Sequence, residues 1–189
     1  HAKDNTTLAR KVSLRRNLLR ALPENITVCE THGGYGMLYE SCYREVSRGL
    51  VFESDSVCAG RLGLQRPTWA VYEADCVAAL AAGVGQHLTV NLLDCDPYGE
   101  PWPVIDAFFQ SVRPRASVLG VAVTDGLRQK LKMHSGWSIA SMQSVVARFG
   151  NGVLYREYVD ICRLLMEEKA AQVGYHLSQW TAYYCGWMQ

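Results

Sequence analysis

Five short apolar segments constrain the fold of this chain more than any other feature. They are residues 26–30, 49–53, 69–73, 88–94 and 118–124. Their positions are almost continuously apolar, which is typical of strands covered on both faces. Segments compatible with helices separate most of them, at residues 37–46, 56–64, 77–82 and 103–112. Strands that alternate with helices predict an α/β fold with a mostly parallel, doubly wound sheet and helices on both faces.

The two ends of the chain differ from this pattern. Residues 1–23 predict a basic N-terminal helix that Pro23 ends, followed by one domain over residues 24–189. Residues 138–149 and 155–173 predict two amphipathic helices, divided by a Gly-Asn-Gly sequence at 150–152. The aromatic tail at 175–188 predicts one or two closing strands. The basic residues before Pro23 indicate either a solvated helix face or contact with an anionic partner.

Composition limits the class of protein and its compartment. A chain of 189 residues that is 49% hydrophobic can bury one core without disulfide or metal staples. The seven cysteines are odd in number and form no CxxC, so we expect reduced, mostly buried thiols, a cytoplasmic location and no metal site. A formal net charge of +1 gives no global field that favours nucleic acid or membrane. The sequence contains no apolar run of about 20 residues, so no membrane span is predicted.

A glycine turn follows the first predicted strand. The residues are Glu30-Thr31-His32-Gly33-Gly34-Tyr35-Gly36. Glycines let a backbone approach a ligand closely, and a following helix offers unpaired N–H groups. The spacing GGxG differs from the GxGxxG of dinucleotide sites. Glu30 would repel a phosphate but attract the ammonium group of a methionine moiety, and His32 is placed to contact its carboxylate. The turn therefore favours S-adenosylmethionine over a nicotinamide cofactor, with a tight turn that binds no ligand as the alternative.

Acidic residues also end the next two predicted strands. Glu53, or else Asp55, is expected to accept the ribose hydroxyls of the cofactor, and Asp75 its adenine amino group. Acidic residues are common at strand ends, so each one alone carries little weight. Three successive strands that end in carboxylates, in a fold whose sites lie at carboxyl ends, indicate a binding site.

The fourth predicted strand leads into Asp94-Cys95-Asp96-Pro97-Tyr98-Gly99. We group Asp94 with the cofactor contacts, and we place Asp96, Pro97 and Tyr98 at the catalytic site. The lone pair of an exocyclic amine is delocalised into its ring, so acceptors for the amine protons are needed to orient that lone pair. Tyr98 offers a flat face on which a base can stack. The alternative is a β-turn, because Asp-Pro and Tyr-Gly are turn dipeptides.

These residues carry a family resemblance. The segments 94–101 (DCDPYGEP), 104–108 (VIDAF) and 119–125 (LGVAVTD) resemble tRNA guanine-N2 dimethyltransferases. Asp96-Pro97-Tyr98 is also similar to the D-P-P-Y box of amino-group DNA methyltransferases, with one proline missing. The specific resemblance covers residues 90–126. A broader resemblance to class I S-adenosylmethionine-dependent methyltransferases, whose fold is Rossmann-like, covers residues 24–189.

The resemblance implies a function and roles for the site residues. S-adenosylmethionine would be the cofactor, and the reaction would be N-methylation of an exocyclic amino group of a nucleobase in RNA. Asp96 would orient the target amine, the Pro97 carbonyl would be the second acceptor and Tyr98 the stacking platform. The glycine turn differs from the first motif of the tRNA enzymes. Two alternatives remain, namely a DNA amino-methyltransferase and a non-catalytic binding or scaffold protein with this fold. The sequence does not predict the oligomeric state.

Overall fold

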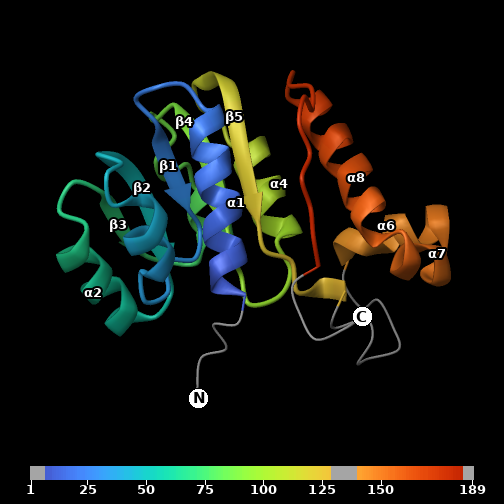
Figure 1. Cartoon of the computed structure of the whole chain (residues 1–189), viewed down its shortest axis with the longest axis horizontal. Coiled ribbons are helices and arrows are strands. Elements are labelled where there is room, and N and C mark those ends of the chain that lie inside the picture. Colours follow the sequence, from blue (N-terminus) through green and yellow to red (C-terminus); the bar gives the residue numbers. More distant parts are fainter. Residues whose placement is uncertain (1–6, 129–139, 185–189) are drawn as a thin grey trace.

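One parallel sheet organises the molecule, and a computed structural model describes residues 7–128 and 140–184 of the chain. The strands are β1 (Thr27–Glu30), β2 (Arg48–Glu53), β3 (Ala70–Glu73), β4 (Val90–Cys95) and β5 (Arg115–Val123). Their order is β3-β2-β1-β4-β5 and every pair is parallel (Figure 1). The predicted doubly wound α/β fold is confirmed. The strand order reverses between β1 and β4, and in such sheets ligands bind outside the carboxyl ends at this point.

The three central strands, β1, β2 and β4, are buried on both faces, which explains why their sequences are almost continuously apolar. Val28 and Leu92 face a core shared with α1 (Leu8–Ala21), the π-helix η1 (Tyr39–Tyr43) and α2 (Ser56–Gln65). The adjacent residues Cys29 and Leu93 face the opposite core. That core is closed by α3 (Cys76–Ala81), α4 (Trp102–Gln110) and α8 (Tyr158–Gln172). Successive strand residues point to opposite faces, so both must be apolar here.

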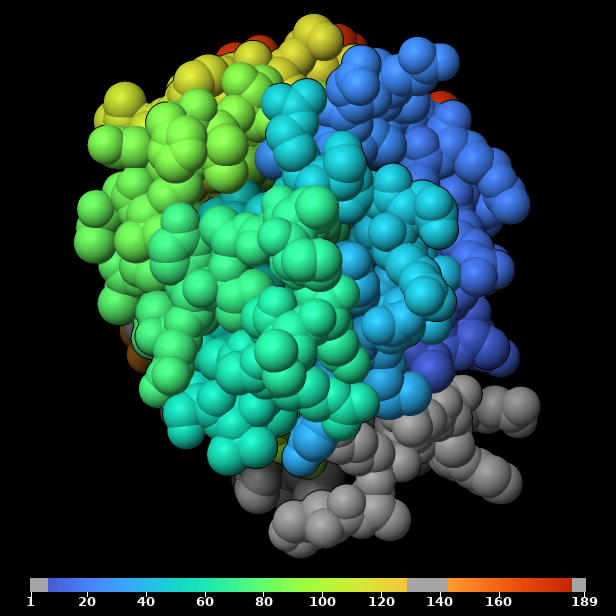
Figure 2. All heavy atoms as spheres, turned by 90° about the vertical axis from the view of Figure 1, so that its left-hand side faces the viewer, coloured from blue at the N-terminus to red at the C-terminus, as the bar shows by residue number. Residues whose placement is uncertain are grey.

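The N-terminal helix α1 packs against the sheet beside β5 (Figure 1). Leu18 lies so close to Gly120 of β5 that a Cβ at that glycine would be 3.1 Å from the leucine side chain. From the side of β3 and α2, the blue helix borders the lighter blue segment that follows β1 (Figure 2). The boundary that the sequence predicts near residue 23 stays a prediction, but the helix shares a core with the sheet.

The segment after the glycine turn differs from the helix predicted over residues 37–46. Residues 37–43 are helical, as predicted, but Tyr39–Tyr43 form the five-residue π-helix η1 and the helix ends three residues early. Both tyrosines at its ends are buried against Trp69, with ring centroids 5.2 Å away for Tyr39 and 6.3 Å for Tyr43. The indole N–H of Trp69 donates to the Val46 carbonyl at 2.8 Å, which fixes the chain as it leaves η1. We attribute the shortened helix to this aromatic packing.

The C-terminal third contains α6 (Ala140–Phe149), α7 (Asn151–Arg156) and α8. The break at Gly150 is confirmed, and this glycine has a φ of 73°. A second break at Glu157 was not predicted. The predicted closing strands are wrong for residues 175–184, which contain no strand. Tyr175 reaches β5 through its hydroxyl, which donates to the Ala116 carbonyl at 2.7 Å, so a side-chain contact replaces strand pairing there. Residues 185–188 of the predicted tail lie outside the described part.

Two further expectations concern the cysteines and membranes. The six described cysteines are free thiols, and all except Cys42 are buried, while Cys185 lies outside the described residues. Among the helices that the structure describes, none combines the length and hydropathy needed to cross a membrane.

Candidate functional site

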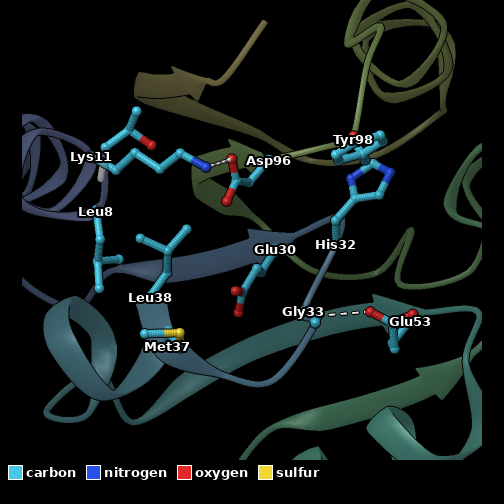
Figure 3. A pocket seen from close by; sticks show the side chains of 12 residues that line it. Leu8, Lys11, Glu30, His32, Gly33, Met37, Leu38, Glu53, Asp96 and Tyr98 are labelled. Atoms are coloured by element: carbon cyan, nitrogen blue, oxygen red, sulfur yellow. Dashed lines mark hydrogen bonds and ion pairs between the residues drawn. The ribbon is translucent and has the colours of Figure 1, made fainter. Parts of the chain in front are cut away.

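A cavity of about 300 Å³ lies at the carboxyl ends of β1, β2 and β4. Four parts of the chain meet there: the start of α1, the turn after β1, the end of β2 and the segment at the end of β4 (Figure 3). The lining residues are Thr7, Leu8, Lys11, Glu30, His32, Gly33, Gly34, Met37, Leu38, Glu53, Asp96 and Tyr98. Seven of the predicted site residues are therefore brought together: Glu30, His32, Gly33, Gly34, Glu53, Asp96 and Tyr98. The fold places the cavity at the reversal of strand order, as expected for this architecture.

The glycines of the turn have different structural roles. A Cβ at Gly33 would lie 2.4 Å from Leu62 and 2.6 Å from Val51, so close packing on β2 and α2 requires glycine there. Gly34 faces open space, and its N–H donates to Glu53 Oε2 at 2.7 Å. Gly36 does not line the cavity; its φ of 77° lets the chain turn into η1. Of the three glycines in the turn, Gly33 and Gly34 line the cavity and Gly36 does not.

Glu30 is a buried carboxylate with one bound and one unbound oxygen. Arg66, itself fully buried, donates to Oε2, while Oε1 has no hydrogen-bond partner among the described residues. Burial raises the pKa of Glu30 to about 7, although the charge of Arg66 opposes the rise. A buried acceptor without a partner is costly unless a ligand donates to it. Because Glu30 lines the cavity, its geometry suits a cationic group bound there.

The residues predicted to contact the ribose and adenine of the cofactor also form hydrogen bonds with neighbouring backbone groups. Glu53 accepts from the N–H groups of Gly34 and Asp55, at 2.7 and 2.9 Å, and its side chain stays partly exposed in the cavity. Asp55 caps α2 through Cys58, and Asp75 caps α3 through Ala78, each at 2.8 Å. Neither cap residue lines the cavity. Their proposed ligand contacts remain predictions, because capping occupies only one carboxylate oxygen of each.

Asp96 lies at the opposite wall of the cavity from Glu53 (Figure 3). Lys11 of α1 donates to its Oδ1 at 2.7 Å. Burial alone would raise the pKa of Asp96, but hydrogen bonds from Lys11 and Thr124 and the charge of Lys11 hold it below its usual range. Asp96 is therefore ionised at neutral pH, and its side chain is largely buried at the cavity wall. Such a group can accept protons from an amine.

Asp94 has an internal partner instead of a place on the cavity wall. The Arg15 guanidinium donates to both carboxylate oxygens, at 2.7 and 2.5 Å, and the Tyr43 hydroxyl adds a bond of 2.5 Å. Asp94 and Arg15 are both buried. Burial alone would lower the pKa of Arg15, but Asp94 raises it above its ordinary value. These bonds give Asp94 a structural role, and a cofactor contact by this residue, which would have to compete with them, stays a prediction.

The segment after Asp96 reaches the outer edge of the cavity. Pro97 does not line it, whereas Tyr98 does and is fully exposed. The loop is held to the segment that follows β5, because Gly126 N–H donates to the Gly99 carbonyl at 2.8 Å. His32 bonds through Nδ1 with the Thr31 hydroxyl at 2.8 Å, and burial lowers the pKa of its ring. His32 is therefore neutral at pH 7 and brings no charge to the cavity.

Helix α1 supplies site residues that sequence reasoning missed. Thr7, Leu8 and Lys11 line the cavity, and Arg15 binds beneath it. We interpreted these basic residues as a solvated face or as contacts to an anionic partner. A usable signal was present, because Lys11 and Arg15 are four apart on a helix and Asp94 and Asp96 two apart on a strand. Each pair therefore shares a face, and the two pairs match in charge.

Comparison with known proteins supports the fold and leaves the family open. No protein-family model and no curated protein sequence matches the chain. The solved N-methyltransferase NodS from Bradyrhizobium japonicum is 12% identical, with a TM-score of 0.53 over 79% of this chain and 85% of that one. The chain has the class I methyltransferase fold. At this identity the likeness shows the fold of the chain and nothing about its acceptor.

Two further methyltransferase structures show weaker similarity. The Escherichia coli protein yhhF, assigned as a methyltransferase, is 16% identical with a TM-score of 0.49 over 59% of this chain. The chain covers 65% of that protein, which is less than two-thirds of its length. A TehB-like SAM-dependent methyltransferase from Corynebacterium glutamicum is 13% identical, with a TM-score of 0.45 over 75% of this chain and 78% of that one. The resemblance of residues 90–126 to tRNA guanine-N2 dimethyltransferases stays a prediction within the class I methyltransferase fold.

Proposed function

We propose that this protein is an S-adenosylmethionine-dependent methyltransferase that methylates an exocyclic amino group of a nucleobase in RNA. One observation carries the proposal: the cavity joins a glycine turn with an unsatisfied buried carboxylate to an anionic Asp96 and an exposed Tyr98. The first half suits a cofactor that carries an ammonium group. The second half suits a planar acceptor that carries an amine.

The residues present fit the cofactor. Glu30 Oε1 is a buried acceptor without a described partner, and the ammonium of the methionine moiety would satisfy it. Glu53 would accept hydrogen bonds from the ribose hydroxyls. Each of its carboxylate oxygens has a lone pair that the bonds from Gly34 and Asp55 do not use. Asp75 would accept the adenine amino group beyond its capping bond. When bound, the cofactor would supply an electrophilic methyl group.

The acceptor half of the cavity would orient the amine and remove its proton. Asp96, kept ionised, would accept one amine hydrogen and the Pro97 carbonyl a second, which aims the nitrogen lone pair at the methyl carbon. The nitrogen–carbon bond would form as the carbon–sulfur bond of the cofactor breaks, and Asp96 would take the proton that the nitrogen then gives up. Tyr98 would hold the base by stacking, since its whole ring is exposed at the cavity edge.

RNA is the proposed partner, and DNA is the alternative. The choice rests on the resemblance of residues 94–101 to the tRNA enzymes and on the missing second proline of the DNA box. The exposed arginines of α1, Arg10, Arg16 and Arg20, would be available to the phosphates of a nucleic acid.

Transfer of tritium from methyl-labelled S-adenosylmethionine to total tRNA, plasmid DNA or protein tests the proposal. We expect label in tRNA, and about 100-fold less of it with Asp96→Ala, because positioning and proton removal are both lost. The control is Asp160→Ala on α8, an exposed aspartate outside the cavity lining, which should leave the rate unchanged. Label in DNA alone would replace the RNA proposal by its alternative. If the protein binds the cofactor but labels none of the pools, the alternative of a non-catalytic scaffold protein would be favoured.

A further inference from the structure

Lys11 and Asp96 form an ion pair inside the cavity, and it occupies one oxygen of the carboxylate that would receive the acceptor amine. The ammonium of Lys11 lies 2.7 Å from Asp96 Oδ1, and the two side chains are 23% and 18% exposed. This ammonium contacts the carboxylate in the way proposed for the acceptor amine (Figure 3). In this arrangement the Lys11 ammonium holds one of the two Asp96 oxygens before any acceptor is present.

The charged residues that line the cavity indicate a second partner for the Lys11 ammonium. Three carboxylates line it, those of Glu30, Glu53 and Asp96. Among the described lining residues Lys11 alone carries a permanent positive charge, because burial keeps His32 neutral. The Oε1 atom of Glu30, which has no described hydrogen-bond partner, would attract the ammonium group of a ligand. An amino-acid moiety bound there brings its own carboxylate close to these carboxylates, and a nearby cation offsets that repulsion most directly.

We propose that Lys11 exchanges Asp96 for the carboxylate of the cofactor's amino-acid moiety, and so frees Asp96 for the acceptor only after the cofactor has bound. This inference rests on the proposed function. Lys11 is a positioning residue in this scheme, and it makes binding of the two substrates ordered. It also makes the site selective for adenosyl ligands that carry an α-carboxylate. The flexible four-carbon stem of lysine permits the move without a shift of α1.

Binding calorimetry with two ligands tests the selectivity. S-adenosylhomocysteine carries the amino-acid moiety, and methylthioadenosine is the same nucleoside thioether without it. We expect Lys11→Met to weaken S-adenosylhomocysteine at least about tenfold and to leave methylthioadenosine within about twofold. Lys169→Met is the matched control, because Lys169 is also 23% exposed and pairs with an aspartate, Asp106, away from the cavity. It should change neither affinity.

Titration of Asp96 by carboxyl-carbon NMR tests the exchange in the unaltered protein, and so does not depend on the folding of a variant. Loss of Lys11 as a partner should raise the pKa of Asp96 when S-adenosylhomocysteine binds, and methylthioadenosine should not raise it. In Lys11→Met the pKa of Asp96 should be high before any ligand is added.

The possible failures are distinguishable. If S-adenosylhomocysteine does not bind the unaltered protein, the proposed function is wrong. If it binds the unaltered protein and leaves the pKa of Asp96 unchanged, the exchange is overturned and the function stands. If Lys11→Met weakens both ligands equally, Lys11 has a general structural role and the inference is overturned.

Discussion

Asp94 near the end of β4 and Asp96 just beyond it lie two residues apart and have different surroundings. Asp94 is closed off by Arg15 and Tyr43, whereas Asp96 lies at the cavity wall with Lys11. Both point toward α1, as the two-residue period of a strand requires. One helix therefore anchors itself through the first aspartate and reaches the site through the second.

Asp94→Asn tests the anchoring role. It leaves Arg15 buried with a neutral partner, and breaking a buried ion pair costs about 3–5 kcal/mol. We expect the free energy of unfolding in urea to fall by about that amount. Asp106→Asn, which removes the partly exposed pair with Lys169, should cost less than about 1 kcal/mol. If Asp94→Asn has normal stability but no longer binds the cofactor, Asp94 contacts the cofactor and does not anchor α1.

Glu30 predicts a pH dependence of cofactor binding. Burial raises its pKa to about 7, above the value of a free glutamate, and only the ionised form attracts an ammonium. We therefore expect the highest affinity for S-adenosylhomocysteine above about pH 8. Below pH 7 the affinity should fall by up to about tenfold per pH unit. Calorimetry over this range checks the slope. Methylthioadenosine, which has no ammonium, should bind with constant affinity; an equal slope for both ligands would assign the effect to another group.

Among the elements, α1 makes the largest difference between this site and the predicted one. The glycine turn and the strand-end acids were recognisable because each combines a short local motif with an apolar strand. The contribution of α1 depends on contacts with Asp94 and Asp96, about 80 residues away, and no local pattern specifies which helix covers which strand. The π-helical turn of η1 was missed for the same reason, since its tyrosines pack on Trp69, which comes later in the chain.

Gly120→Val tests the packing of α1 on β5. The larger side chain would meet Leu18, which already lies 3.1 Å from an added Cβ, and overpacking of this kind costs about 1–3 kcal/mol. We expect a lower free energy of unfolding and, because Lys11 moves with the helix, weaker binding of S-adenosylhomocysteine. Gly63→Ala on α2 is the control, since its Cβ meets nothing within 4 Å. It should be neutral or stabilise by less than about 1 kcal/mol. Unchanged stability of Gly120→Val would mean that α1 does not pack as described.

At the scale of the whole molecule, strand order brings the site together. The continuous apolar segments were sufficient to predict the parallel sheet, and the order β3-β2-β1-β4-β5 then places Glu30, Glu53 and Asp96 around one cavity. Asp55 and Asp75 could not be separated from Glu53 by sequence, because a helix cap and a ligand contact use the same residue type at the same position. The tail was misjudged because aromatic composition favours strands and also favours surface packing.

Amide chemical-shift mapping of the ¹⁵N-labelled protein during titration with S-adenosylhomocysteine tests the central claim most directly. We predict saturable shifts at Gly33, Gly34 and Glu53, at the carboxyl ends of β1 and β2, and at Asp96 beyond β4. Thr27, Arg48 and Val90, which begin the same strands, should stay unchanged and serve as internal controls. A folded protein that shows no shifts at millimolar ligand, or shifts only at the strand beginnings, would contradict the assignment of this cavity as the cofactor site.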